Sequence, residues 1–155
     1  MNSMATIRDF LAQKRIAVVG VSHDPRDISR GLLRTFRERG YDAVAVNPEL
    51  KVVEDAPCYP NLAAVAPPLD GVLIMTSPAI TDQIVGECVA LGIRRVWMYR
   101  AGGKGGAVSD AAIAFCTEHG IAVVPGECPY MFLPHSEWIH RLHGFVRKVT
   151  GAYPA

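Results

Sequence analysis

The residues best suited to chemistry in this chain come at the end of its first strand-like run. Residues 16–19 are apolar and mostly β-branched, and Gly20, Val21 and Ser22 follow them directly. Such a run is typical of a buried parallel strand, and a glycine at its carboxyl end lets the backbone turn tightly. The amide groups of this turn and of the following helix N-terminus attract phosphate. The pattern therefore predicts the opening of a nucleotide-binding strand–helix–strand unit.

The spacing of the glycines argues against a binding site for NAD or NADP. Residues 20–25 supply only the first glycine of the Gly-x-Gly-x-x-Gly fingerprint. The second strand ends in Asn47 and Pro48, where a carboxylate would hold the ribose of NAD, and Glu49 comes two residues late. The glycine loop 102–106 contains a lysine but lacks the Walker A spacing. An NAD(P)-binding oxidoreductase is therefore the weaker alternative, and ATP hydrolysis at a P-loop is not supported.

Basic side chains near these glycines favour a polyanionic ligand. Arg26, Arg30 and Arg34 recur every four residues, so they form one stripe beside the predicted anion site if the helix begins early; a solvated helix face is the alternative. Arg100 precedes the glycine loop, whose amides could face an anion or simply the solvent. The residues predicted to contact the ligand are Gly20, Val21, Ser22, Arg26, Ser29, Arg30, Asn47, Pro48, Thr76, Arg100 and Cys128.

Nucleophilic and metal chemistry are weakly represented. Cys128 lies at a predicted strand end, but Glu127 beside it would raise the thiol pKa, which favours a structural or contacting role. His140 and His143 are one helical turn apart without an accompanying carboxylate or cysteine, which favours a solvated or partner-contacting stripe over a metal site. We predict no catalytic residue and no metal ion.

Strand and helix patterns alternate along the whole chain. The predicted strands are residues 15–19, 43–47, 71–75, 95–99 and 121–124. The predicted helices are residues 6–13, 29–40, 79–91, 109–118 and about 135–149, with one further turn at 61–65 and a polar loop before it. Ser29 is the expected N-cap of the second helix.

These elements predict an α/β fold, a three-layer Rossmann-like domain with a doubly wound, parallel five-stranded sheet and an extra C-terminal helix. The expected strand order is 3-2-1-4-5, with right-handed crossovers. In that order the ligand crevice lies outside the carboxyl ends of strands one and four. It would place residues 22–30 opposite residues 100–106, with Thr76 and Cys128 on the same rim.

Length and composition limit the number of domains and the kinds of partner. The 155 residues predict one domain, spanning 1–155 with its core at about 15–130, and the net charge of +1 indicates neither nucleic acid nor a membrane surface as partner. Four widely spaced cysteines and the lack of a signal-peptide pattern favour a reduced, cytoplasmic protein. The apolar face of the last helix indicates core packing, with a homodimer contact as the alternative.

Five short motifs, in order, resemble those of the small CoA-binding proteins, which are single Rossmann domains similar to the N-terminal domain of the succinyl-CoA ligase α subunit. The motifs lie within about residues 16–129 and are Val18-Val19-Gly20-Val21-Ser22, Val46-Asn47-Pro48, Tyr59-Pro60-Asn61-Leu62, Val96-Trp97-Met98 and Glu127-Cys128-Pro129. The resemblance implies coenzyme A held across the strand ends, with its phosphates near the Gly-x-Ser loop. It does not imply catalysis.

We therefore expect a protein that binds coenzyme A or an acyl-CoA as a non-catalytic, regulatory module. The alternatives are the NAD(P)-binding oxidoreductase and an interaction subunit that presents CoA to a separate ligase.

Overall fold

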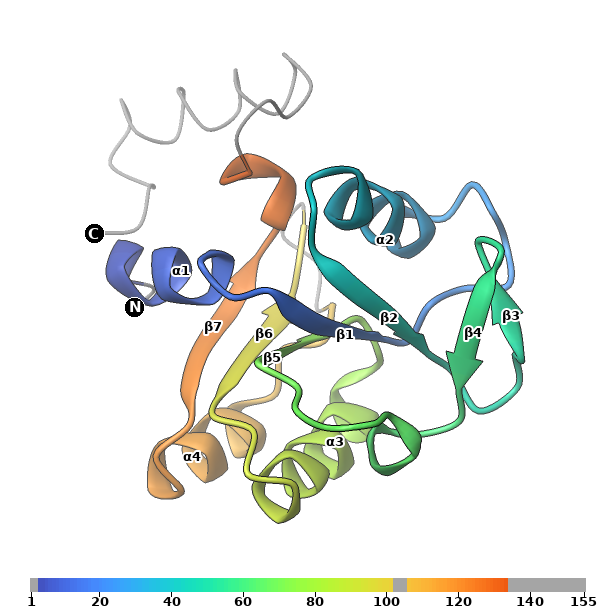
Figure 1. Cartoon of the computed structure of the whole chain (residues 1–155). Coiled ribbons are helices and arrows are strands. Elements are labelled where there is room, and N and C mark those ends of the chain that lie inside the picture. The colour runs from blue at the N-terminus through green and yellow to red at the C-terminus, as the bar shows by residue number, and fades with distance from the viewer. Residues whose placement is uncertain (1–2, 102–105, 134–155) are drawn as a thin grey trace.

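Strands and helices alternate through the computed structural model, which describes residues 3–101 and 106–133 (Figure 1). The strands are β1 (Arg15–Val19), β2 (Asp42–Val46), β3 (Val52–Val53), β4 (Ala56–Tyr59), β5 (Gly71–Ile74), β6 (Arg95–Tyr99) and β7 (Ala122–Glu127). The α-helices are α1 (Met4–Leu11), α2 (Ile28–Glu38), α3 (Pro78–Ala90) and α4 (Asp110–Glu118), with short 3₁₀ turns η1 (Leu62–Ala64) and η2 (Pro129–Met131). No helix within these ranges is long and apolar enough to cross a membrane.

The sheet has seven strands in the order β3-β4-β2-β1-β5-β6-β7. All neighbours are parallel except the hairpin pair β3 and β4. The predicted α/β, Rossmann-like class is confirmed, but the predicted count of five strands and the order 3-2-1-4-5 are wrong. β5 lies beside β1, not beyond β2. Counting only the parallel strands, β4 is the third, and the order becomes 3-2-1-4-5-6.

The error has a local cause in the segment predicted as a polar loop. β4 is four residues long and contains Pro57, which argues against a central strand, and β3 has only two residues. Yet β4 pairs with β2 through Cys58 and Tyr59 and occupies the position that we assigned to residues 71–75. The winding therefore reverses between β1 and β5, and not between β1 and β6 as expected.

Two helical layers cover the sheet, with α1 and α2 on one face and α3 and α4 on the other (Figure 1). The side chains of β1 alternate between them, because successive residues of a strand point to opposite faces. Ile16 and Val18 pack in the cluster under α1 and α2, whereas Ala17 and Val19 pack in the cluster under α3 and α4. All four are at most 4% exposed, so β1 is buried on both faces, as its apolar run predicts.

Trp97 of β6 ties α1 and the end of β7 into this core. It is fully buried, stacks edge-on against Phe10 of α1 at 5.4 Å between ring centroids, and donates its indole N–H to the Glu127 carbonyl at 2.9 Å. Burial of large side chains of this kind contributes about 1.5–3 kcal/mol each. The interaction holds the carboxyl ends of β6 and β7 together, next to the site described below.

Several predictions lie outside the described residues. They are the C-terminal helix at about 135–149 with its homodimer contact, His140 and His143, and most of the glycine loop 102–106.

Candidate nucleotide-binding site

The turn after β1 depends on Gly20. Its φ is +92°, and its amide donates to the Val46 carbonyl at 3.0 Å. A Cβ at this position would lie 2.9 Å from the backbone carbonyl atoms of Met75 and from Cγ2 of Thr76. The turn therefore packs directly on the residues after β5, and two of the predicted site residues, Gly20 and Thr76, are in contact. A bare backbone is required here for both conformation and space.

The loop then enters α2 through a cap that differs from the predicted one. Asp27, not Ser29, is the N-cap: its carboxylate accepts hydrogen bonds from the Ser29 amide at 2.8 Å and the Ser29 hydroxyl at 2.6 Å. Ser29 is 1% exposed, and its Oγ accepts the Ser22 amide at 2.9 Å. Ser29 is in the first turn of α2, where its buried hydroxyl holds the loop, so we correct its role from cap to loop anchor.

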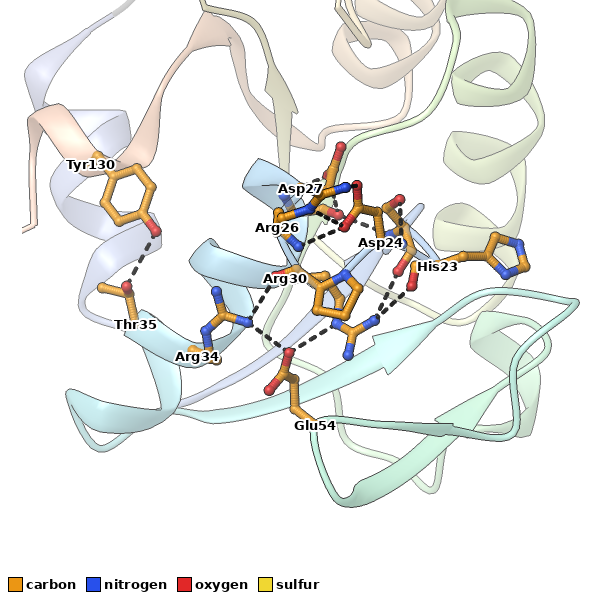
Figure 2. Close-up of polar contacts among 12 residues, drawn as sticks. His23, Asp24, Arg26, Asp27, Arg30, Arg34, Thr35, Glu54 and Tyr130 are labelled. Carbon is orange, nitrogen blue, oxygen red and sulfur yellow. Dashed lines mark hydrogen bonds and ion pairs between the residues drawn. The ribbon is translucent and has the colours of Figure 1, made fainter.

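Arg30 holds the same loop from the other side (Figure 2). Its Nη1 donates to the carbonyl oxygens of Ser22 at 3.2 Å and His23 at 3.3 Å. Its side chain is only 12% exposed. The arginine predicted to meet the ligand's phosphate therefore bonds the loop backbone directly, a role that sequence spacing cannot reveal.

Glu54 completes this arrangement from the turn between β3 and β4. One carboxylate oxygen accepts hydrogen bonds from Arg30 Nε at 2.9 Å and from Arg34 Nη1 at 2.7 Å. Partial burial raises the pKa of Glu54, but the hydrogen bonds and charges of the two arginines outweigh it and hold that pKa below its ordinary value. The carboxylate is therefore ionised at neutral pH. The predicted stripe of Arg30 and Arg34 is an ion-paired surface rather than a freely solvated helix face.

The remaining arginines of the prediction are differently placed. Arg26 lies before α2, its side chain is 90% exposed, and it pairs with Asp24 at 3.2 Å. Arg100 follows β6, so one strand, β5, separates it from β1. Its guanidinium lies against Gly126, where a Cβ would be 2.6 Å from Nη2. The structure therefore does not place the Arg100 loop opposite the 22–30 loop across adjacent strands, as the predicted order required.

The end of β2 contributes Asn47 and Pro48. The Asn47 amide group donates to the Val21 carbonyl at 2.7 Å, and its Oδ1 accepts the Glu49 amide at 2.8 Å. Asn47 thus joins the ends of β1 and β2 where NAD-binding folds place a carboxylate. Pro48 is exposed beside it. Val21 is fully buried, and its side chain packs in the core cluster under α1 and α2.

Cys128 lies at the end of β7, 6% exposed, close to Tyr99. Burial is the largest influence on its thiol and raises the pKa, and Glu127 raises it further, while hydrogen bonds with Tyr130 and Tyr99 oppose the rise in part. The pKa of Tyr99 is raised to about 12, mainly by burial and also by Cys128. Both groups are therefore neutral at pH 7, and the thiolate needed for nucleophilic attack is scarce.

We predict that Cys128 reacts slowly in the folded protein. A disulfide reagent at pH 7.5, or oxidised CoA followed by intact-mass measurement, should label it far more slowly than the same thiol in denaturant, because burial disfavours the thiolate. The Cys128→Ser variant serves as the control that assigns any signal. Rapid labelling of the native protein, lost in that variant, would show that the surroundings of Cys128 activate this thiol.

Sequence reasoning missed three groups at this site: Glu54, Asp27 and Tyr99. Glu54 and Asp55 both have positive φ values, 51° and 59°, and form a two-residue turn between short strands. The local sequence, Val52-Val53 followed by Glu54-Asp55, gives only a weak hairpin signal, because glutamate is unusual at such a φ. Nothing in the local sequence shows that Glu54 would reach α2.

Comparison with known proteins agrees with this fold. A family model described as a CoA binding domain matches residues 14–134. ADP-forming acetate–CoA ligase I of Archaeoglobus fulgidus is 22% identical over 120 residues, and the match covers 74% of this chain. The chain spans only 18% of that ligase.

Two solved structures illustrate the likeness. A hypothetical protein from Pyrococcus horikoshii OT3 superposes with a TM-score of 0.74 at 26% identity, covering 81% of this chain and 85% of that one. The apo form of the dinucleotide-forming acetyl-coenzyme A synthetase 1 of Ca. Korarchaeum cryptofilum shares the fold, with a TM-score of 0.64 at 22% identity over 76% of this chain and 27% of that one. Because the matched family segment runs from before β1 to beyond η2 and makes up most of the sequence, this chain belongs to the CoA-binding domain family.

Proposed function

We propose that this protein binds coenzyme A or an acyl-CoA at the carboxyl ends of β1, β2 and β5, as a non-catalytic, regulatory module. The observation that carries the proposal is the loop of residues 20–27. It is pressed against Met75, tied to β2 through Asn47, and held from behind by Arg30. Membership of the family supports CoA as the ligand.

The loop offers an anion the backbone amide of His23, ahead of the helix. A trans peptide points its N–H away from the preceding carbonyl, so the Ser22 carbonyl bonded to Arg30 turns the His23 amide to the opposite side. That amide has no hydrogen-bond partner within residues 3–101 and 106–133. The Ser29 amide, in contrast, is already taken by Asp27. We therefore infer that the CoA phosphates meet the His23 amide and Arg26 rather than the Ser29 amide.

Ligand preference is the direct test of this function. Titration calorimetry should show CoA binding at least tenfold more tightly than NAD or NADP, because the fingerprint glycines and the ribose-binding carboxylate are replaced here. Raised salt should weaken CoA binding, as expected for a polyanion. Native mass spectrometry of freshly purified protein would identify any retained nucleotide. Equal or tighter binding of NAD would overturn the proposal in favour of the oxidoreductase.

A second candidate is an interaction subunit that presents CoA to a separate ligase. The observation that favours it is the likeness to one segment of the acetate–CoA ligase, of which this chain spans 18%. In both cases we expect the isolated chain to leave acetyl-CoA intact over the uncatalysed background, and thioester hydrolysis by the purified protein would contradict both. The four cysteines are unpaired and buried, which supports a reducing compartment such as the cytoplasm.

A further inference from the structure

We propose that Glu54, in the turn between β3 and β4, is a positioning residue for the CoA-binding loop and acts through Arg30 and Arg34. The inference rests on the proposed function and deepens it. In Figure 2, Glu54 points from the hairpin toward α2, where both arginines point back at it. The hairpin is therefore joined to the candidate site by an ion pair that bridges two parts of the fold.

The two arginines extend this contact to the loop. Arg30 donates to the carbonyls of Ser22 and His23, and Arg34 Nη1 donates to the Pro25 carbonyl at 3.2 Å. Three carbonyl groups of one short loop are thus directed at two guanidinium groups. Because each trans peptide points its N–H opposite to its C=O, this also directs the following amides away from the arginines. The Asp24 and Arg26 amides donate to side chains of the loop itself. The loop conformation and the direction of the His23 amide therefore depend on where the guanidinium groups lie.

Glu54 is the group that keeps them there. The Arg30 side chain is 12% exposed and that of Arg34 is 42% exposed, and the two cations share one carboxylate oxygen. Without the carboxylate, two neighbouring positive charges would repel each other, and the more buried one would lack its counter-ion. Arg30 would then move toward water and release the Ser22 and His23 carbonyls. The turn keeps Glu54 at a φ of 51°, a conformation uncommon for a residue with a side chain.

A purely electrostatic role of Glu54 and a positioning role predict opposite effects of its substitution on CoA affinity. Replacing Glu54 with glutamine removes a negative charge next to a polyanion site, so simple Coulomb attraction would tighten CoA binding. If Glu54 positions the loop, the same variant should weaken CoA binding by about tenfold, the scale of losing one or two charge-assisted hydrogen bonds. Tighter or unchanged binding of Glu54→Gln would overturn the proposal, and tighter binding would show that Glu54 competes with the ligand for the arginines.

The matched control is Asp55→Asn. Asp55 is the exposed neighbour in the same turn, with a φ of 59° that asparagine tolerates, so the variant removes the same charge without touching the arginines. It should bind CoA as the wild type does or slightly more tightly. Glu54→Gly removes the carboxylate and also relieves the backbone strain of the turn, because glycine adopts a positive φ readily. It should weaken CoA binding as Glu54→Gln does, and wild-type affinity in this variant would contradict the role of the carboxylate.

Hydrogen exchange of the protein without CoA gives a readout that does not depend on ligand binding. In Glu54→Gln, the hydrogen-bonded amides of Ser22, Asp24 and Arg26 should exchange faster than in the wild type, while those of β1 and β5 remain protected. Unchanged exchange in the loop would refute the positioning role even if CoA affinity fell. If the wild type fails to bind CoA but the loop loses protection in the variant, the proposed ligand is wrong and the positioning role stands.

Discussion

Gly20→Ala is expected to destabilise the fold by about 2–5 kcal/mol and to weaken CoA binding by more than tenfold. The positive φ costs a residue with a Cβ roughly 1–2 kcal/mol, and forcing a methyl group into packed atoms costs roughly 1–3 kcal/mol more. At Gly20 those atoms are the backbone of Met75 and the Thr76 methyl group, 2.9 Å from the Cβ. Denaturant unfolding measures the first effect and calorimetry the second.

Gly40→Ala is the matched control for this substitution. Gly40 has nearly the same φ, +89°, but a Cβ there would meet nothing within 4 Å. It should show only the conformational cost, about 1–2 kcal/mol, and bind CoA like the wild type. If both variants lose stability equally and both bind CoA normally, the close approach of the turn to Met75 has no role in the site.

Arg30→Ala is expected to weaken CoA binding by at least tenfold, an effect larger than that of Arg26→Ala. It removes the donors to two loop carbonyls and leaves Arg34 as the ion-pair partner of Glu54 within the described residues. Hydrogen bonds involving a charged group contribute about 1.5–3 kcal/mol each. Arg30→Lys should not restore binding, since a single ammonium cannot reproduce the fork that reaches Glu54 and the loop together. Calorimetry at two salt concentrations measures all three variants.

Two control experiments distinguish the effect of Arg30→Ala from the simple loss of one positive charge. Arg8→Ala removes the same charge from an exposed position on α1 and should leave CoA affinity unchanged. Arg26 is 90% exposed, so the effect of its substitution should shrink as salt is raised, whereas that of Arg30 should persist. Wild-type CoA affinity in Arg30→Ala would mean that the loop keeps its shape without the clamp.

The limits of two parallel strands could be predicted from the sequence because each carries its own local signal. The limits of β1 and β6 agree with the predicted 15–19 and 95–99, since a short apolar run bounded by polar residues or glycine specifies a buried strand without help from the rest of the chain. The Gly-x-Ser turn and the cap at Asn61 are of the same kind. They depend on bonds between residues a few positions apart.

The strand order could not be obtained in this way. It depended on β4, whose pairing with β2 outweighs the poor strand character of Pro57, and this choice is made by tertiary hydrogen bonds rather than by propensity. Missing one short strand moved the switch point by one position. The predicted partner of the first loop therefore changed from the Arg100 segment to Thr76.

The sequence by itself determined the fold class, the family resemblance and the glycine turn after β1, because glycine, strand and cap patterns act over short separations. Only the tertiary structure decided what the arginines do. In the sequence, Glu54 lies 24 residues from Arg30 and 20 residues from Arg34. The three side chains meet because the β3–β4 turn packs on α2. Long-range ion pairs depend on that docking, and a stripe of arginines looks the same in a sequence whether it faces water or a carboxylate.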